Sequence, residues 1–317
     1  MTKVINFTDL KEGYFKKSTN VLVIGFFDGV HKGHQDIIRK SIKRAKAVGG
    51  CSVALTFDIP PVNIISGRKA KKLIMPFKEK INIISSFGID YIISVSFNKE
   101  FAGLSAEDFC SIIIIEKINA REVFIGENFK FGKGARGDFI FLKECLNKDN
   151  RTVHAIKLLK INDVVVSSTE IRKLYDEGDI EKIKLFLGRY PAIDGVVQKG
   201  FSRGTSIGFP TANMEIEDLY VIPANGVYIG KIKIENNAKT FPSLINIGNN
   251  PTFGYRKTLI EVHILNFRGD IYSKKITVKF LKYLRNEIKF NRPEDLVNQI
   301  NIDIEKCMEY FKSKRRV

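Results

Sequence analysis

The hydrophobic period of this chain changes once, near residue 188, and this change constrains the fold more than any other feature. Before it, short β-branched runs such as residues 21–24 and 51–57 alternate with segments such as 35–47, whose apolar residues recur every three or four positions. After it, apolar and polar residues alternate one by one, as in residues 259–264. The first pattern indicates strands and amphipathic helices, and the second indicates half-buried strands. The two parts therefore need different folds.

The first part predicts a doubly wound α/β domain. Strands and helices follow one another in strict alternation, and parallel strands need such crossover connections. A sheet covered by helices on both faces follows from this order. The expected strands lie at residues 21–24, 51–57, 91–95, 123–125 and 152–158, and the expected helices at 35–47, 76–87 and 105–117.

The second part predicts a small antiparallel β-barrel. Ile260, Val262 and Ile264 share one face of a strand, while Glu261 and His263 share the other. Turn signals at residues 223–226, 248–251 and 268–270 separate such runs, which suits antiparallel strands that close on themselves. A final helix, opened by proline in its first turn, has its apolar residues on one face; they are Leu296, Ile300, Ile304 and Phe311. We place the domain boundary at residues 186/187.

Composition excludes several classes of protein. The 317 residues are 44% hydrophobic and 27% charged, which is the usage of a globular chain rather than of a disordered or collagen-like one. No apolar run approaches the roughly 20 residues that span a bilayer, and residues 1–17 lack the apolar core of a signal peptide, so we expect a cytoplasmic protein without a membrane partner. Four scattered cysteines suggest neither disulfides nor a zinc site. The net charge of +17 predicts anionic ligands.

The first chemical motif is Gly-Phe-Phe-Asp-Gly-Val-His-Lys-Gly-His at residues 25–34. It joins the first expected strand to the first expected helix, where open α/β sheets bind ligands. Glycines let the backbone approach a phosphate, and the start of a helix offers free N–H groups. His31 and His34 can both face that phosphate and stabilise the charge that develops on its oxygens. A lone histidine there would usually be structural, but two of the four histidines in one glycine turn favour function.

Three further segments can bind phosphates or activate a hydroxyl group. Residues 167–172 read Ser-Ser-Thr-Glu-Ile-Arg, a hydroxyl cluster that opens a helix with Arg172 one turn on; alone, this is an ordinary N-cap. Residues 200–208 contain three glycines four apart and a basic residue, which suits a triphosphate but is weak evidence by itself. Glu261 could accept the proton of a hydroxyl that attacks a γ-phosphate, although such a glutamate is usually only solvated.

These segments resemble one known family. The sequence His31-Lys-Gly-His34 resembles the HxGH signature of adenylyl-transferring nucleotidyltransferases, and the longer motif at 25–34 resembles the version in bacterial bifunctional riboflavin kinase/FAD synthetases. Residues 126–138 and 167–172 resemble that family's flavin-side and SSTxxR motifs. Residues 209–213 resemble the PTAN signature of riboflavin kinases, 261–265 their catalytic strand and 280–290 the segment that closes over the flavin. The resemblance covers the chain from about Val21 to Phe311.

The resemblance implies the fold, two reactions and their site residues. A Rossmann-like FMN adenylyltransferase domain, residues 1–186, would convert FMN and ATP to FAD and pyrophosphate. A riboflavin kinase barrel, residues 187–317, would convert riboflavin and ATP to FMN and ADP. The catalytic residues would be His31, His34 and Glu261. ATP of the adenylyltransferase would bind Gly25, Phe27, Asp28, Gly29, Gly33, Ser167, Ser168, Thr169 and Arg172, and its flavin Asn128 and Phe129. In the kinase, ATP would bind Gly200, Arg203, Gly204, Thr205 and Gly208, the flavin Arg285 and Glu287, and Mg²⁺ Thr211 and Asn213.

Two alternatives stay open at this point. The family commonly shows a histidine after the second strand, and Thr56-Phe-Asp-Ile-Pro-Pro61 lacks it, so the chain could be a riboflavin kinase with a degenerate adenylyltransferase domain. A basic nucleic-acid-binding protein is the second alternative, because of the net charge and the Lys-Arg-rich tail at 312–316; the dispersed basic residues speak against it. We expect riboflavin, FMN and ATP as the partners, no nucleic acid, and a monomer or weak homo-oligomer.

Overall fold

The computed structural model describes residues 1–16, 18–60, 71–198, 208–249 and 258–314. Its contacts divide the chain into two compact units, Met1–Ser168 and Thr169–Val317, each of which is described by itself. These contacts group nearly all of α7 (Ser168–Glu177), which precedes the boundary expected at 186/187, and α8 (Ile180–Leu187), which crosses it by one residue, with the second unit.

The first unit contains a six-stranded sheet in the order β1-β4-β3-β2-β5-β6, in which every pairing is parallel. The chain winds from β2 outward through β3 and β4, and then returns to the other side of β2 to form β5 and β6. The point where the order reverses, between β2 and β5, is where such sheets bind ligands. The strands are β1 (Lys3–Asn6), β2 (Asn20–Ile24), β3 (Cys51–Phe57), β4 (Tyr91–Val95), β5 (Ala120–Gly126) and β6 (Thr152–Ile156).

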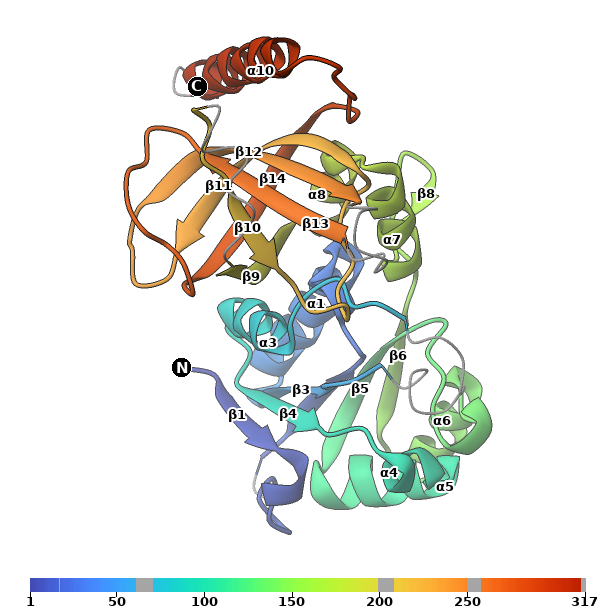
Figure 1. Cartoon of the computed structure of the whole chain (residues 1–317). Helices are drawn as coiled ribbons and strands as arrows, with labels where there is room; N and C mark the ends of the chain where they lie inside the picture. The colour runs from blue at the N-terminus through green and yellow to red at the C-terminus, as the bar shows by residue number, and fades with distance from the viewer. Residues whose placement is uncertain (17, 61–70, 199–207, 250–257, 315–317) are drawn as a thin grey trace. The chain divides into compact units, whose positions relative to one another are not determined.

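Helices cover both faces of this sheet, as the doubly wound prediction requires (Figure 1). Val21 and Val23 of β2 pack in a core with Ile38 of α1, whereas Leu22 and Ile24 pack in a second core with Ile113. A strand buried on both faces is apolar throughout, which explains the continuous run at 21–24. Helices α1 (Lys32–Ala47) and α3 (Phe77–Ser86) cover one face; the other carries α4 (Lys99–Gly103), α5 (Ala106–Asp108), the π-helical η3 (Phe109–Lys117) and α6 (Phe139–Asn147).

Several short elements of the first unit were not predicted. The edge strand β1 has four residues, and the hairpin of β7 (Lys160–Ile161) and β8 (Val164–Val165) has two in each strand. Such short runs carry no readable period. The helix expected at 105–117 is divided into α5 and the π-helical η3. The described residues of this unit also contain three single 3₁₀ turns, η1 (Phe7–Asp9), η2 (Asp28–Val30) and η4 (Lys133–Ala135).

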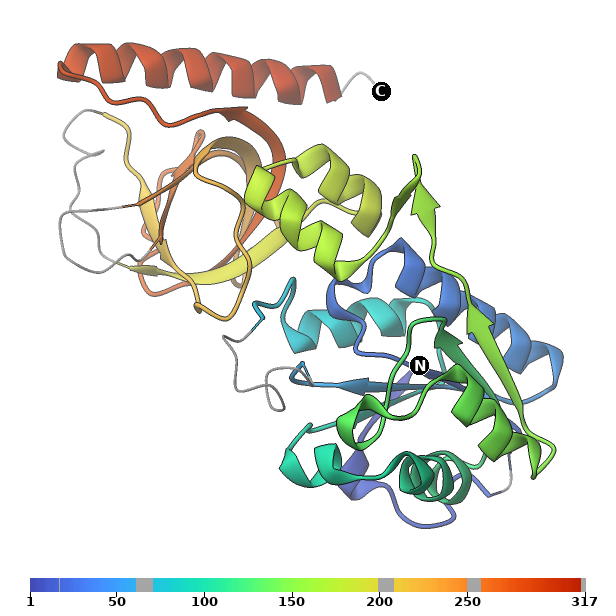
Figure 2. The same ribbon diagram turned by 90° about the vertical axis from the view of Figure 1, so that its right-hand side faces the viewer.

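The second unit is a closed antiparallel barrel in the order β10-β13-β12-β11-β14-β9, with β9 paired to β10. Figure 2 shows the barrel as a ring, with α10 (Pro293–Lys314) lying along its outside. Ile260 and Val262 are fully buried, while Glu261 and His263 between them are only partly so, as the alternation predicted. The strands are β9 (Ala192–Gln198), β10 (Ala212–Glu215), β11 (Gly226–Ile234), β12 (Thr240–Asn249), β13 (Thr258–Ile264) and β14 (Lys275–Arg285).

In the described part of the second unit, three helices pack on the barrel: α7, α8 and α10. The core beneath α10 joins Cys307, Ile304 and Phe311 of the helix to Ile229 and Leu244 of the barrel. Helix α7 is anchored to this unit by a hydrogen bond from Ala224 N to Tyr175 O at 2.9 Å. None of the helices in the described part of the chain is both long and apolar enough to cross a membrane.

Candidate active sites

The glycine turn after β2 is tightly wound. Phe27, Gly29 and Val30 all have positive φ, at 54°, 77° and 38°. A Cβ at Gly29 would lie 3.1 Å from the side chain of Ile74, so glycine suits this position for both backbone and space. The Asp28 carboxylate accepts a hydrogen bond from Ile74 N at 3.0 Å, which fixes the turn to the segment before α3. A left-handed β-branched residue such as Val30 costs free energy, and such residues cluster at binding sites.

The turn ends with the two predicted histidines side by side at the start of α1. His31 caps the helix by accepting a hydrogen bond from His34 N at 3.3 Å, and the two rings stack with centroids 3.5 Å apart. Burial first, and then the charges of His31 and Lys80, hold the pKa of His34 well below its usual range. His34 Nδ1 is buried and has no hydrogen-bond partner among the described residues. A neutral imidazole with an unsatisfied nitrogen is suited to a ligand.

Ser168 joins this turn from the far end of the unit. Its hydroxyl donates to Asp28 O at 3.0 Å, so the start of the Ser-Ser-Thr segment lies against the glycine turn. Ser167 precedes it, and Thr169 and Arg172 continue on α7 in the second unit. The structure thus brings together residues that are separated by 140 positions in the sequence.

The flavin-side motif lies at the carboxyl end of β5, the neighbour of β2 in the sheet. Phe129 N donates to Gly126 O at 2.9 Å, and the Phe129 ring stacks on Phe131 with centroids 5.7 Å apart. Asn128 is exposed. Both predicted flavin-binding residues therefore follow the strand beside the glycine turn, at the point where the strand order reverses.

Lys80 of α3 also belongs to this edge of the sheet, and sequence reasoning missed it. The side chain is buried, and its ammonium donates to Phe26 O at 2.8 Å and to Phe57 O at 2.6 Å. Burial lowers the pKa of Lys80 to about 7, against the opposing charges of Asp28 and Asp58. A signal did exist: Lys80 stands three residues after Phe77 and four before Ile84, on the apolar stripe of a helix.

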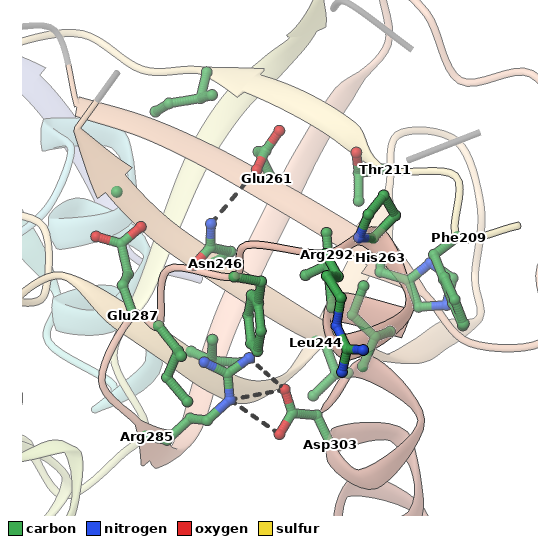
Figure 3. Close-up of a pocket in the computed structure, with 18 of the residues that line it drawn as sticks. Phe209, Thr211, Leu244, Asn246, Glu261, His263, Arg285, Glu287, Arg292 and Asp303 are labelled. Atoms are coloured by element: carbon green, nitrogen blue, oxygen red, sulfur yellow. Dashed lines mark hydrogen bonds and ion pairs between the residues drawn. The ribbon is translucent and has the colours of Figure 1, made fainter. Parts of the chain in front are cut away.

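The barrel carries a cavity of about 710 Å³ on its outer face, next to α10. Figure 3 shows that Thr211, Asn246 and Glu261 line it from the barrel, with Arg285 at the end of β14 and Glu287 in the segment that leads to the helix. This volume falls in the range of small-molecule sites, roughly 300–1,000 Å³. Four predicted kinase residues, for base, metal and flavin, thus share one cavity with Asn246, which was not predicted.

The strand register sets the surroundings of Glu261. It stands opposite Asn213 on β10 and opposite Asn246 on β12, so the three side chains share one face of the sheet. Asn246 Nδ2 donates to Glu261 Oε2 at 3.4 Å. His263 Nδ1 contacts Pro210 O at 2.9 Å and so holds the residue before Thr211. Asn246 and His263 were not predicted as site residues, although the period-two pattern already placed His263 on the face of Glu261.

Arg285 and Glu287 occupy different surroundings. Arg285 donates to Asp303 Oδ2 on α10 from Nη2 at 2.7 Å and from Nε at 2.9 Å, and its Nε also donates to Asp303 Oδ1 at 3.1 Å (Figure 3). Asp303 is only 2% exposed and was not predicted. The Glu287 carboxylate lies against Gly248, where a Cβ would meet it. Burial first, and then the charge of Glu261, raise the pKa of Glu287, while Arg285 opposes the change.

A second cavity of about 420 Å³ lies beside the first. Thr211 lines both, and Arg268 and Tyr272 line the second one. Of the predicted glycine loop, Gly208 is exposed with φ 91°. The other residues of that prediction, Gly200, Arg203, Gly204 and Thr205, lie outside the described residues.

Comparisons with known proteins match both units. The FAD synthetase family matches residues 15–170, and the riboflavin kinase family matches residues 187–311. A bifunctional riboflavin kinase/FMN adenylyltransferase of Buchnera aphidicola is 37% identical over 93% of this chain and 95% of its own length. The protein of that name from Bacillus subtilis is 33% identical over 95% of each chain, and the one from Escherichia coli K12 is 30% identical over 92% of each.

A solved structure from Streptococcus pneumoniae, described as a macrolide-efflux protein, has a TM-score of 0.84 and 28% identity, over 95% of this chain and 97% of its own. The efflux description belongs to that protein. The two family matches account for both nucleotide motifs, so neither the kinase-only alternative nor the nucleic-acid-binding alternative is favoured. Similarity over nearly the whole length, in both units, shows that the chain belongs to the family of bifunctional riboflavin kinase/FMN adenylyltransferases.

Proposed function

We propose that the two activities of this family are carried by the two sites described above, the kinase by the cavity of the barrel and the adenylyltransferase by the glycine turn. The observation that carries the assignment is the position of Thr211. It lines the cavity that contains Glu261 and also the neighbouring one, so a phosphoryl donor in one cavity can meet an acceptor in the other.

In the kinase, riboflavin would occupy the larger cavity and ATP the smaller. The Glu261 carboxylate accepts the proton of the terminal ribityl hydroxyl, whose oxygen attacks the γ-phosphorus, and ADP leaves. The hydrogen bond from Asn246 orients the carboxylate. Arg285, held by Asp303, and Glu287 bound the flavin side of the cavity. Gly200, Arg203, Gly204, Thr205 and Gly208 would contact the nucleotide.

Magnesium fits the kinase site as a companion of the nucleotide. Thr211 and Asn213 offer neutral oxygens next to Glu261, and among the described residues no group of three His, Cys, Asp or Glu side chains could hold a metal ion. Magnesium retains water and binds through one or two protein oxygens plus phosphates, which matches this set. When bound, the ion neutralises phosphate charge during transfer.

In the adenylyltransferase, a phosphate oxygen of FMN attacks the α-phosphorus of ATP and pyrophosphate leaves. His31 and His34 would donate hydrogen bonds to the α-phosphate oxygens as charge develops on them. The turn residues Gly25, Phe27, Asp28, Gly29 and Gly33 would surround the nucleotide, and Ser167, Ser168, Thr169 and Arg172 would bind the departing pyrophosphate. Asn128 and Phe129 would contact the flavin.

The proposal also covers the cellular location, the oligomeric state and the binding partners of the protein. Both substrates of the second reaction are anions, and the net charge of +17 favours their approach. We propose a cytoplasmic monomer or weak homo-oligomer that binds neither nucleic acid nor membranes. A filter-binding salt titration tests the first exclusion, since binding to a phosphate backbone weakens steeply with salt.

One assay tests both reactions. The purified chain is incubated with riboflavin, ATP and Mg²⁺, and the flavins are separated by chromatography at successive times. We expect FMN to appear first and FAD to follow; FMN alone would overturn the adenylyltransferase assignment, and unchanged riboflavin would overturn the kinase assignment. A parallel reaction that starts from FMN measures the second step by itself.

A further inference from the structure

Lys80 has no part in the roles assigned so far, yet its environment is unusual. Among the described residues it is the one lysine with a buried side chain, at 2% exposure. Burial of an ammonium group is costly unless the group is well bonded. An uncharged hydrogen-bond donor at this position would cost less to bury. The presence of a lysine therefore suggests that its amine has a functional role.

The ammonium of Lys80 joins the carboxyl ends of two neighbouring strands. It donates to Phe57 O, in the last residue of β3, and to Phe26 O, two residues beyond the end of β2. Thr56 Oγ1 donates to the same Phe26 oxygen at 3.1 Å. The ring of Phe26 lies 4.2 Å from the Lys80 nitrogen, and that of Phe77 lies 5.1 Å from it. Aromatic faces and carbonyl oxygens thus surround the charge on several sides.

Phe26 lies at the start of the turn that carries the histidines. Phe26 directly precedes Phe27, the first left-handed residue of the glycine turn, which runs on to His31. The charge of Lys80 is also close enough to His34 to lower the pKa of that imidazole. The other titratable groups whose charges shift the pKa of these side chains are His31 for His34, and Asp28 and Asp58 for Lys80.

We propose that Lys80 is a positioning residue for adenylyl transfer: by binding Phe26 O and Phe57 O together, its amine fixes the turn that presents His31 and His34 to the α-phosphate. The inference rests on the proposed function of that turn. It assigns Lys80 no contact with substrate. Removal of the amine lets Phe26 move, and displacement of reacting groups by about 1 Å can slow a reaction about 100-fold.

The experiment uses the full chain and three variants. Lys80→Met removes the donors and the charge at similar length, Lys80→Gln keeps two N–H donors without the charge, and Lys78→Met changes an exposed lysine of the same helix. We expect Lys80→Met to lower kcat for FMN adenylylation about 100-fold, with little change in KM for ATP. Lys80→Gln should retain more activity than Lys80→Met, and Lys78→Met should match the parent. Riboflavin phosphorylation by the same samples measures the amount of active protein.

Histidine NMR supplies a readout that a merely structural lysine would not move. The chain has only four histidines, and His31 and His34 are stacked, so their ring signals report the geometry of the turn. Lys80→Met should shift both signals and raise the pKa of His34, whereas Lys78→Met should not. If Lys80→Met fails to fold by circular dichroism, Lys80→Gln decides the question by the same measurements.

A folded Lys80 variant with parental kcat and parental histidine signals overturns the inference, even if its melting temperature is lower. Failure of the proposed function looks different: the parent itself would then make no FAD from FMN. The two failures are thus separate.

Discussion

The chemistry proposed for His31, His34 and Glu261 depends on two kinds of neighbour: residues close in the sequence and residues brought near by the fold. The histidines are positioned locally, by one turn whose glycines and helix start are all visible in ten consecutive residues, and for this reason the sequence alone predicted them. The neighbours of Glu261 come from other strands, and the partner of Phe26 is Lys80, 54 residues away. Asn246 and Asp303 act through long-range contacts and leave no local pattern, so they were found only in the structure. Lys80 has a local sign, its place on an apolar helical stripe, but its partners were found only in the structure.

Replacement of either His31 or His34 by alanine should lower FAD formation from FMN by about two orders of magnitude, the cost of one preorganised donor to the transition state. Riboflavin phosphorylation should stay near the parental rate, because Glu261 and its cavity belong to the other unit. Both rates are measured on the same samples by flavin chromatography. Parental FAD formation in both variants would show that the histidines are not the groups that stabilise the transition state.

Glu261→Gln keeps the shape of the side chain but removes the base, so riboflavin phosphorylation should fall by about 100- to 10,000-fold. Supplied FMN should still become FAD. The matched control is Glu215→Gln, an exposed glutamate of β10 in the same barrel, which should phosphorylate riboflavin normally. Normal phosphorylation by Glu261→Gln as well would mean that Glu261 is only a solvated strand residue.

At the scale of elements, apolar runs bounded by turns were predictable and short or polar elements were not. The expected strands at 51–57 and 91–95 coincide with β3 and β4, which are buried almost throughout. Strand β1, with four mostly exposed residues, is fixed by pairing with β4 rather than by any pattern of its own. Pro293 correctly predicted the start of α10. The ion pair between Asp303 of this helix and Arg285 of the barrel was not predicted, because a charged residue on an amphipathic helix is usually expected to face solvent.

Removal of the Asp303 carboxylate should lower the stability of the second unit and also disturb the flavin site proposed there. Asp303→Ala leaves Arg285 unpaired at 18% side-chain exposure, and loss of one partner of a buried ion pair costs about 3–5 kcal/mol. The control is Asp295→Ala. Its partner Arg292 is 73% exposed, and loss of such a surface ion pair should lower the free energy of unfolding by only about 0–1 kcal/mol. Denaturant unfolding followed by circular dichroism measures both costs. We also expect a higher KM for riboflavin in Asp303→Ala; equal stability of the two variants would contradict a buried anchor.

At the scale of the whole molecule, the change of hydrophobic period correctly predicted two folds in one chain. It could not predict which of the two units α7 and α8 pack against, because these helices lie at the junction between the two patterns. Leu187 and Phe186 of α8 are buried, and Tyr175 of α7 bonds to Ala224 in the second unit. An amphipathic helix shows that it has an apolar face, but not which core that face covers. The family matches also leave residues 171–186 between them.

Fragments of the chain test the junction. A fragment from Thr169 to Val317 should fold and convert riboflavin to FMN without making FAD, since it contains Thr211, Asn213, Glu261 and α10. A fragment from Gly188 should also phosphorylate riboflavin, but it should melt at a lower temperature because α7 and α8 are missing. Circular dichroism and the phosphorylation assay compare them. Two inactive, unfolded fragments would show that the units do not fold independently.

The cavity beside Glu261 has one more consequence, which concerns the order in which the protein is made. One of its walls comes from residues 285–303, and Asp303, which holds Arg285, lies near the end of the chain. Domains fold as synthesis proceeds, N-terminal first. A nascent chain can therefore complete every strand of the barrel, and place Glu261 on its surface, before the wall beside Glu261 exists. If the proposed assignment of this cavity holds, a chain that stops before α10 would carry Glu261 without this wall, and we expect such a chain not to phosphorylate riboflavin.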